Sequence, residues 1–136
     1  MPEYSLGPLL RLAGKRASVA FAEALAPLGI EGRHFGVLLN LERQGPLNQR
    51  GLSSATGGDK STMTRTIDDL AARGLVRRRP AETDRRANLV ELTEAGRAVF
   101  QEAERVAIRV NDELLAHMTP DEGDALRRHL RRFIEA

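Results

Sequence analysis

The sequence predicts a mainly α-helical fold with one small β-hairpin. Apolar residues recur at steps of three and four along most of the 136-residue chain, which is the spacing of one face of a helix. Only two short segments, at residues 75–79 and 88–92, have the length and the branched residues of strands. The 21 Lys+Arg, 19 Asp+Glu and 41% hydrophobic residues are ordinary for one globular domain.

The first half of the chain contains two predicted helices joined by a break. Leucines and alanines recur at helical spacing over residues 6–26, and Pro27 and Gly29 end this first helix. A second helix is expected over residues 32–43, which stops before Gly45-Pro46. Each helix has one apolar face, so each must pack against another element.

Two further helices flank a sharp glycine turn. Residues 48–56 form a short, partly apolar segment, and Gly57-Gly58 then breaks the chain. Asp59 is well suited to cap the next helix, residues 60–73, because its carboxylate can accept the free N–H groups of the first turn. Gly74 is placed to end that helix.

The remaining elements are a hairpin and two helices. Residues 75–79 and 88–92 have the pattern of short strands, with a polar, charged connection between them. A long helix is expected from residue 93 to about residue 117. Residues 119–122 have the pattern of a capping box with Pro at the first helical position, which predicts a last helix over 120–135.

The order of the middle elements points to a function. A short helix, a tight turn, a helix whose outward face bears Ser, Thr and Arg, and a basic hairpin have the pattern of a helix-turn-helix with a wing. Residues 60–86 hold eight Lys or Arg residues against four Asp or Glu residues, although the whole chain has a net charge of only +2. This local excess is typical of a surface that faces a polyanion. We therefore predict that the chain binds double-stranded DNA.

The predicted DNA contacts lie on this helix and on the hairpin. Arg65 can reach guanine O6 and N7 as a fork, and small hydroxyls near the helix N-terminus can sit against phosphates and base edges. The three arginines at 77–79 alternate between strand faces, so some can meet phosphates while another braces the wing. Arginines at the hairpin tip can enter the narrow minor groove, and Asp84 can hold Arg86 in a fixed direction. The predicted set is Lys60, Ser61, Thr62, Thr64, Arg65, Arg77, Arg79, Asp84, Arg85 and Arg86.

These residues resemble the MarR family of bacterial winged-helix regulators, and the likeness extends over nearly the whole chain. The resemblance implies a homodimer whose recognition helices enter successive major grooves, with Arg86 as the wing arginine in the minor groove and Asp84 orienting it. It also implies repression of the dimer's own promoter and release by a small aromatic or anionic ligand, bound near the junction of the dimerisation and DNA-binding regions. The matching stretches are Asp59-Lys60-Ser61-Thr62-Met63-Thr64-Arg65, Leu70 with Arg73-Gly74-Leu75-Val76, Asp84-Arg85-Arg86, and Leu92-Thr93 with Gly96.

Three features depart from the family pattern. Gly58 stands where a branched apolar residue usually follows the turn glycine, and Thr56 replaces the usual leucine. Each change removes apolar surface that would pin the short helix, and the second glycine loosens the turn by about 1 kcal/mol. Glu31-Gly32 also stands where a Thr or Ser cap is more usual. We expect the DNA-binding half to be more mobile than in a typical member.

A dimer is also expected from the residues themselves. The long helix would span about 37 Å, which is more than a core of this size can cover on one side, and the first and last helices have further apolar faces. Packing across a two-fold axis would place the recognition helices about 34 Å apart, one turn of DNA, so the operator should be a pseudo-palindrome. We therefore divide the subunit, residues 1–136, into a DNA-binding region at 31–92 and a helical dimerisation region at 1–30 and 93–136.

A candidate ligand site involves the first two helices. Arg11, Lys15 and Arg16 of the first helix, with His34 and Phe35 of the second, could present a cation and an apolar wall to an aromatic carboxylate. The other interpretation of these residues is an ordinary helix interface with surface arginines.

The composition disfavours several other functions. A chain with no Cys has no disulfide framework and no thiolate zinc site, and its three His residues lack partners at metal-ligand spacing. No nucleophile and base can be placed in one cleft, so we expect no enzyme activity, no cofactor and no metal. The apolar runs fall far below the roughly 20 residues of a membrane helix and no secretory signal is recognised, which favours a cytoplasmic protein without membrane contact.

We predict a dimeric, sequence-specific DNA-binding transcriptional regulator, a repressor released by a small ligand. The alternative is a winged-helix ligand- or protein-binding module that has lost DNA binding, which the departures at Thr56 and Gly58 suggest. Salt-sensitive retention on duplex DNA would separate the two.

Overall fold

A computed structural model describes residues 5–81 and 88–136 of the chain. The elements are α1 (Leu6–Leu25), the 3-10 turn η1 (Ala26–Leu28), α2 (Gly32–Gln44), α3 (Gln49–Thr56), α4 (Lys60–Ala72), β1 (Val76–Pro80), β2 (Asn88–Leu92), α5 (Glu94–Leu114) and α6 (Pro120–Glu135). The two strands pair as an antiparallel hairpin. The predicted mainly α-helical fold with one small hairpin is confirmed.

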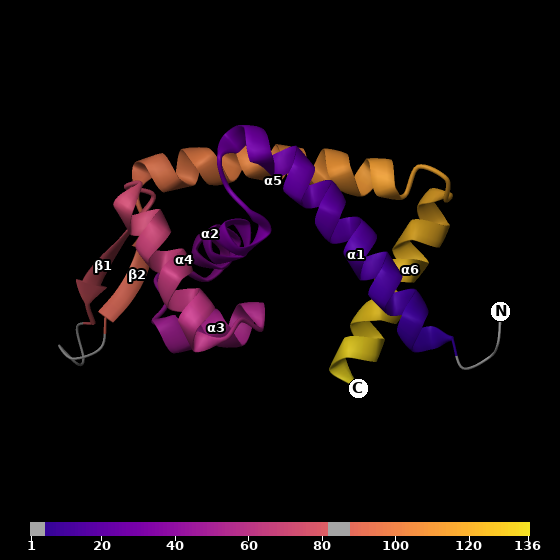
Figure 1. Cartoon of the computed structure of the whole chain (residues 1–136), viewed down its shortest axis with the longest axis horizontal. Helices are drawn as coiled ribbons and strands as arrows, with labels where there is room; N and C mark the ends of the chain where they lie inside the picture. The colour runs from indigo at the N-terminus through magenta and orange to yellow at the C-terminus, as the bar shows by residue number, and fades with distance from the viewer. Residues whose placement is uncertain (1–4, 82–87) are drawn as a thin grey trace.

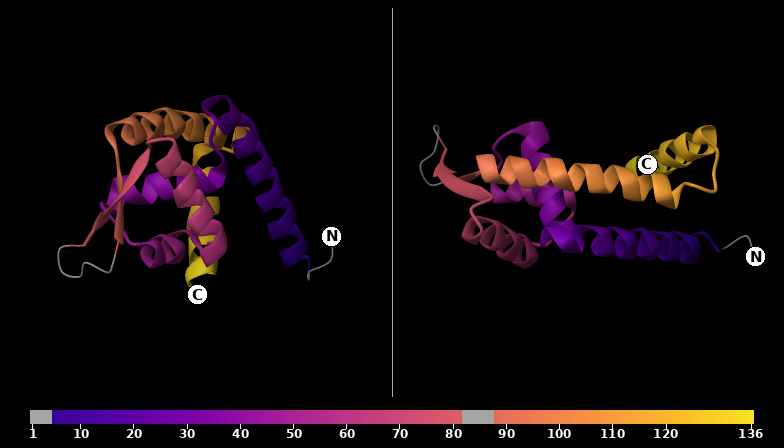
Figure 2. Two further views of the ribbon diagram at one scale, coloured as in Figure 1. Left: turned by 60° about the vertical axis from the view of Figure 1, so that its left-hand side comes forward. Right: turned by 90° about the horizontal axis from the view of Figure 1, so that it is seen from above.

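The elements form two lobes connected by α5 (Figure 1). The lobe on the left contains α2, α3, α4 and the hairpin, and the lobe on the right contains α6 and most of α1. Helices α1 and α5 contact each other along the connection, as the view from above shows (Figure 2). The helix-turn-helix and its wing therefore form one unit, which α1 meets at its C-terminal end, where Leu25 packs with Ile30 and Ala103.

One main core holds together the lobe that contains α2, α3, α4 and the hairpin. It is built from side chains with almost no exposure that come from every element of the lobe, including Leu38 of α2, Leu52 of α3, Ile67 of α4 and Val90 of β2. Phe100 of α5 joins the same core. Each such side chain contributes about 1.5–3 kcal/mol through burial, so the orientation of α4 relative to α2, α3 and the hairpin is well determined.

The connection from α4 to β1 begins the strand one residue later than predicted. The Leu75 N–H donates to the Leu70 carbonyl and the Gly74 N–H to the Ala71 carbonyl, the paired bonds of a Schellman cap. Gly74 has φ of 70°, a left-handed conformation that favours glycine. Because Leu75 serves this cap, the strand starts at Val76 and not at residue 75.

Helix α5 ends at Leu114, three residues before the predicted limit near 117. Met118 then donates its N–H to the Leu115 carbonyl in a turn. Thr119 precedes Pro120 and is extended, with φ of −69° and ψ of 159°, the conformation favoured by a residue before proline. The predicted capping box is present: the Thr119 hydroxyl accepts from the Glu122 N–H, and the Glu122 carboxylate accepts from the Thr119 N–H. Helix α5 is therefore roughly 32 Å long, shorter than the expected 37 Å.

Apolar side chains remain exposed on the terminal helices. Helix α1 has one buried residue, Leu25, and the only buried residue of α6 is Gly123. Large apolar side chains on these two helices are open to solvent in the single chain, and Phe133, for example, is 56% exposed. The exposed set comprises Leu6, Leu9, Leu12, Val19, Leu126, Leu130, Phe133 and Ile134, together with Ile108 of α5.

Candidate nucleic-acid interface

Asp59 caps the N-terminus of α4, as predicted. Its Oδ1 accepts the Thr62 N–H at 2.8 Å and its Oδ2 accepts the Thr62 hydroxyl at 3.0 Å. These bonds stabilise the charged carboxylate and hold the pKa of Asp59 below its usual range. The Thr62 hydroxyl therefore donates its one proton to Asp59. Thr62, a predicted DNA contact, has no donor left for DNA.

Thr64 is held from two directions. Its hydroxyl donates to the Lys60 carbonyl at 2.9 Å, and its Oγ1 accepts from Gln49 Nε2 of α3 at 2.7 Å. Because a hydroxyl has one proton, Thr64 has no further donor. Sequence reasoning missed Gln49, since the two residues are fifteen positions apart and no periodic pattern links them.

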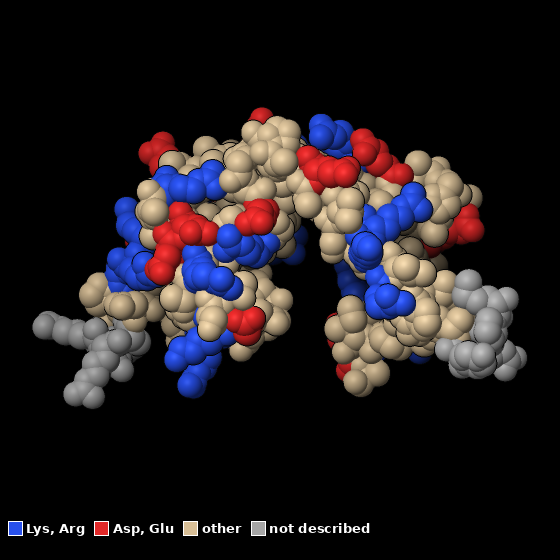
Figure 3. Space-filling model, in the orientation of Figure 1, with Lys and Arg blue, Asp and Glu red and all other residues tan. Residues whose placement is uncertain are grey.

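The exposed residues of α4 include Asp68 and Asp69, which pair with Arg78 and Arg33. They also include Lys60, Ser61 and Arg65, and among the described residues these last three side chains have no hydrogen-bond or ion-pair partner. In contrast, four arginines of this lobe, Arg33, Arg77, Arg78 and Arg79, are paired with carboxylates, and Figure 3 shows blue and red side chains interleaved over this lobe. The Arg65 guanidinium is thus available to a ligand.

The arginines of β1 alternate between faces, as predicted. Glu91 of β2 accepts from Arg77 Nε at 2.6 Å and from Arg79 Nε at 2.7 Å, and the two cations hold the pKa of Glu91 below its usual range. Arg78 lies on the other face and contacts Asp68 of α4 at 2.5 Å. Arg78 therefore braces the wing against α4, while the charges of Arg77 and Arg79 are partly offset by one carboxylate.

A cluster at the start of α2 ties that helix to α4. Arg33 donates to Thr66 Oγ1 and to Asp69 Oδ2, both at 2.9 Å. His34 is only 5% exposed; its Nδ1 accepts the Glu31 N–H at 2.9 Å, and its Nε2 lies 3.4 Å from Asp69 Oδ2. Burial, with a further contribution from Arg33, lowers the pKa of His34. Glu31 occupies the position where a Thr or Ser cap is more usual. It caps α2 through a capping box with His34.

The departures at Thr56 and Gly58 lie beside a hollow of about 340 Å³ between α2 and the turn. The Thr56 hydroxyl donates to the Leu52 carbonyl at 2.8 Å, so its polar group is satisfied within α3. Gly57 takes the left-handed conformation with φ of 74°, whereas Gly58 does not. The missing apolar side chains thus leave space next to Gly58.

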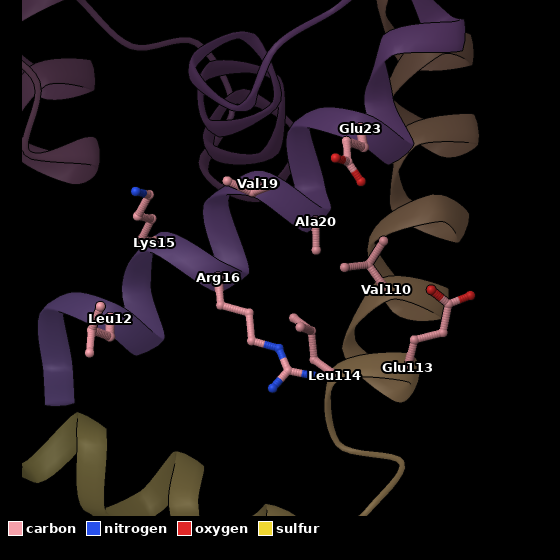
Figure 4. A pocket seen from close by; sticks show the side chains of 9 residues that line it. All are labelled: Leu12, Lys15, Arg16, Val19, Ala20, Glu23, Val110, Glu113 and Leu114. Carbon is pink, nitrogen blue, oxygen red and sulfur yellow. The ribbon is translucent and has the colours of Figure 1, made fainter.

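The predicted ligand residues do not gather in one groove. A groove of about 540 Å³ lies between α1 and α5 and is lined by two of them, Lys15 and Arg16, and by the carboxylates of Glu23 and Glu113. Arg16 extends across it toward Leu114 (Figure 4). Phe35 instead stacks on Phe100 with ring centroids 5.9 Å apart, and His34 belongs to the cluster on α4. Arg11 is exposed on α1.

The predicted wing-tip residues Asp84, Arg85 and Arg86 lie outside the described residues.

Within residues 5–81 and 88–136, no helix is both long enough and apolar enough to cross a bilayer. The same residues contain no group of three or more His, Cys, Asp or Glu side chains that could hold a metal ion.

Comparisons with known proteins agree with this geometry. Residues 28–87 match a family model for the MarR family. The chain is 32% identical to YwoH of Bacillus subtilis, described as an HTH-type transcriptional regulator, over 97% of this chain and 93% of YwoH.

Solved structures of the same fold cover nearly the whole chain. A structure of Bordetella bronchiseptica BpsR, concerned with the regulation of its DNA binding by 6-hydroxynicotinic acid, has a TM-score of 0.91 and 30% identity over 100% of this chain and 99% of BpsR. A mutant of E. coli MarR in complex with operator DNA has a TM-score of 0.88 and 27% identity over 96% of this chain and 94% of that one.

Proposed function

The chain belongs to the MarR family of transcriptional regulators, and from this premise we propose that it is a dimeric, sequence-specific DNA-binding repressor released by a small ligand. Arg65 carries the proposal. It is the arginine of α4, its side chain is exposed and has no ion pair among the described residues, and α4 is the recognition helix of the fold. A guanidinium so presented can donate two parallel bonds to guanine O6 and N7.

Further contacts are proposed around Arg65. Lys60 and Ser61 lie on the same exposed face and can meet phosphates. Arg77 and Arg79 can meet the backbone once DNA competes with Glu91. Asp84, Arg85 and Arg86 complete the proposed surface from the sequence alone, and Thr62 and Thr64 contribute through oxygen atoms that can only accept.

The test is a salt titration of binding to duplex DNA, followed by fluorescence anisotropy. The duplex is one selected by the wild-type chain from a random pool. We expect affinity to fall steeply with salt, because phosphate contacts release counterions, and Arg65→Ala to weaken binding by about 5- to 150-fold. Arg105→Ala on α5 removes the same charge at a distance and is the matched control. Salt-insensitive retention of the wild-type chain would favour a module that has lost DNA binding.

We propose that residues 1–30 and 93–136 form the dimerisation region, around the DNA-binding region at 31–92. The exposed apolar side chains of α1 and α6 support this assignment, since a contiguous apolar face of this kind marks an interaction site. Sedimentation velocity should give a dimer, and Leu130→Glu should shift it toward monomer. Arg128→Glu places the same carboxylate on the opposite face of α6 and should not.

We further propose a small aromatic or anionic effector, with the chain acting on DNA in the cytoplasm and having no catalytic role. The groove between α1 and α5 is lined by Lys15, Arg16, Glu23 and Glu113, and Arg16, which extends across it (Figure 4), is the cation that would pair with a carboxylate on the effector. The compound 6-hydroxynicotinic acid, which regulates DNA binding by BpsR, is a suitable first probe. It should lower DNA affinity in the wild-type chain and not in Arg16→Ala.

A further inference from the structure

The start of α4 carries three hydroxyl groups, and two of them have no proton left for a base. Thr62 donates to Asp59, and Thr64 donates to the Lys60 carbonyl. Ser61 has no such partner among the described residues. The two threonines therefore differ from Ser61 in what they can read, although all three have the same functional group.

Gln49 occupies one of the two lone pairs of the Thr64 hydroxyl oxygen. The side chain of Gln49 leaves the first turn of α3, where Asn48 Oδ1 accepts the Gly51 N–H at 2.7 Å and fixes the backbone. Its Nε2 donates to Thr64 Oγ1 at 2.7 Å and lies 3.3 Å from the Lys60 carbonyl oxygen. One carboxamide thus connects α3 to the oxygen atoms on one turn of α4.

The hydrogen-bond inventory of Thr64 then follows from elementary chemistry. A hydroxyl oxygen has two lone pairs and one proton. The proton goes to Lys60, and one lone pair accepts from Gln49, so one lone pair is left. Toward a base edge, Thr64 can only accept.

We propose that Gln49 is a positioning residue for sequence reading: the Lys60 carbonyl takes the Thr64 proton and makes Thr64 an acceptor-only contact, and Gln49 occupies one lone pair and fixes the direction of the other. Such a contact pairs with the amino groups of adenine N6 or cytosine N4 and not with the oxygens of guanine or thymine. This inference rests on the proposed DNA-binding function and adds to it a source of specificity beside Arg65.

A double-mutant cycle tests the proposal. Gln49→Met keeps the length of the side chain without its donor, and Thr64→Val keeps the shape of threonine without its hydroxyl. For each single variant and the double variant, affinity is measured for the duplex selected by the wild-type chain and for a random-sequence duplex. Circular dichroism melting establishes that each variant is folded.

We expect each single variant to lower the ratio of selected to random affinity by about fivefold, the effect of losing one hydrogen bond. The double variant should lose about the same fivefold, because both changes remove one interaction. Affinity for the random duplex should not change.

Three results would overturn the proposal. Gln49→Met could leave the ratio at its wild-type value, the two losses could multiply to about 25-fold, or random-duplex affinity could fall, which would make Gln49 a phosphate contact. A wild-type chain that binds no duplex would instead contradict the proposed function, and this inference with it. In the free protein, Thr64→Val should shift the Gln49 side-chain amide signals in a ¹H–¹⁵N spectrum; unshifted signals would contradict the Gln49–Thr64 bond without any DNA.

Discussion

Gly96 of α5 lies directly against the backbone of Leu75, in the turn between α4 and the wing. A Cβ atom placed on Gly96 would come within 1.9 Å of the Leu75 carbonyl oxygen, a distance that atoms do not tolerate. The neighbouring Thr93 adds two links, since its N–H donates to the Leu75 carbonyl and its hydroxyl to the Gly74 carbonyl. Helix α5 is therefore docked against the turn that sets the angle between α4 and the wing.

Gly96→Ala should destabilise the chain by about 1–3 kcal/mol or more, because the added methyl group overpacks a contact made by rigid backbone. The measurement is urea unfolding followed by circular dichroism. Gly32→Ala is the matched control, since a Cβ at Gly32 meets nothing within 4 Å. Equal stability of the two variants would contradict the close docking of α5.

Gly58→Ala should stabilise the chain by about 0.4–1 kcal/mol, because it restricts the unfolded chain and can be accommodated in the folded one. The new Cβ would lie 3.4 Å from Thr56 Oγ1 and 3.7 Å from Met63 Cε, both ordinary contacts beside the hollow. Gly57→Ala should have the opposite effect, since its φ of 74° strains a side chain. The midpoints of thermal unfolding should move in opposite directions for these neighbours.

Stability should fall as the pH is lowered from 7.5 to 5.5. Burial holds the folded-state pKa of His34 below the unfolded value of about 6.5, so the unfolded chain takes up the proton first. The stabilisation from neutral His34 is complete above that value and is lost as the pH falls below it. The groups that face His34 are Glu31, Arg33 and Asp69. The pKa of Asp69 is also lowered, but its contribution is lost only below about pH 4.

His34→Gln separates this effect from other titrations. Gln at this position can keep the capping box but does not titrate, so its unfolding midpoint should fall less between pH 7.5 and 5.5 than that of the wild-type chain. The other two histidines are common to both proteins. Parallel curves would show that His34 is not the group responsible.

Glu91→Gln should raise DNA affinity at low salt by about two- to fivefold and steepen its salt dependence, because Arg77 and Arg79 lose the carboxylate that offsets them. Anisotropy over a salt series provides the measurement. Glu102→Gln changes the same charge on α5, where Glu102 pairs with Arg105, and should have little effect. A smaller affinity in Glu91→Gln would mean that Glu91 serves DNA binding by orienting the two arginines.

The fold was largely predictable because its signals are local. Caps such as Asp59 and Thr119 depend on residues three positions away, and helical faces depend on steps of three and four. Errors of one to three residues arose where contacts with a neighbouring element determine where a helix or strand ends. Leu75, for example, donates its N–H to the C-terminal cap of α4, so the strand begins at Val76.

The site was less predictable because its hydrogen bonds and ion pairs join residues that are far apart in the sequence. Arg33 and Asp69 are 36 positions apart, and Gln49 reaches α4 across 15, so neither pattern could be recognised. The sequence predicted hydroxyls and an arginine on one outward face, and Ser61 and Arg65 are exposed there, whereas Thr62 and Thr64 are half-buried. Which hydroxyls retain a donor depends on partners that only folding brings together.

Protection of guanine N7 from dimethyl sulfate methylation tests the central claim most directly, because N7 is an atom that Arg65 is proposed to cover. On the selected duplex, the wild-type chain should protect guanines in two half-sites one helical turn apart. Arg65→Ala, at a concentration that restores occupancy, should lose that protection while Arg105→Ala retains it. Unprotected guanines under the bound wild-type chain, or the same protection with Arg65→Ala, would contradict the account.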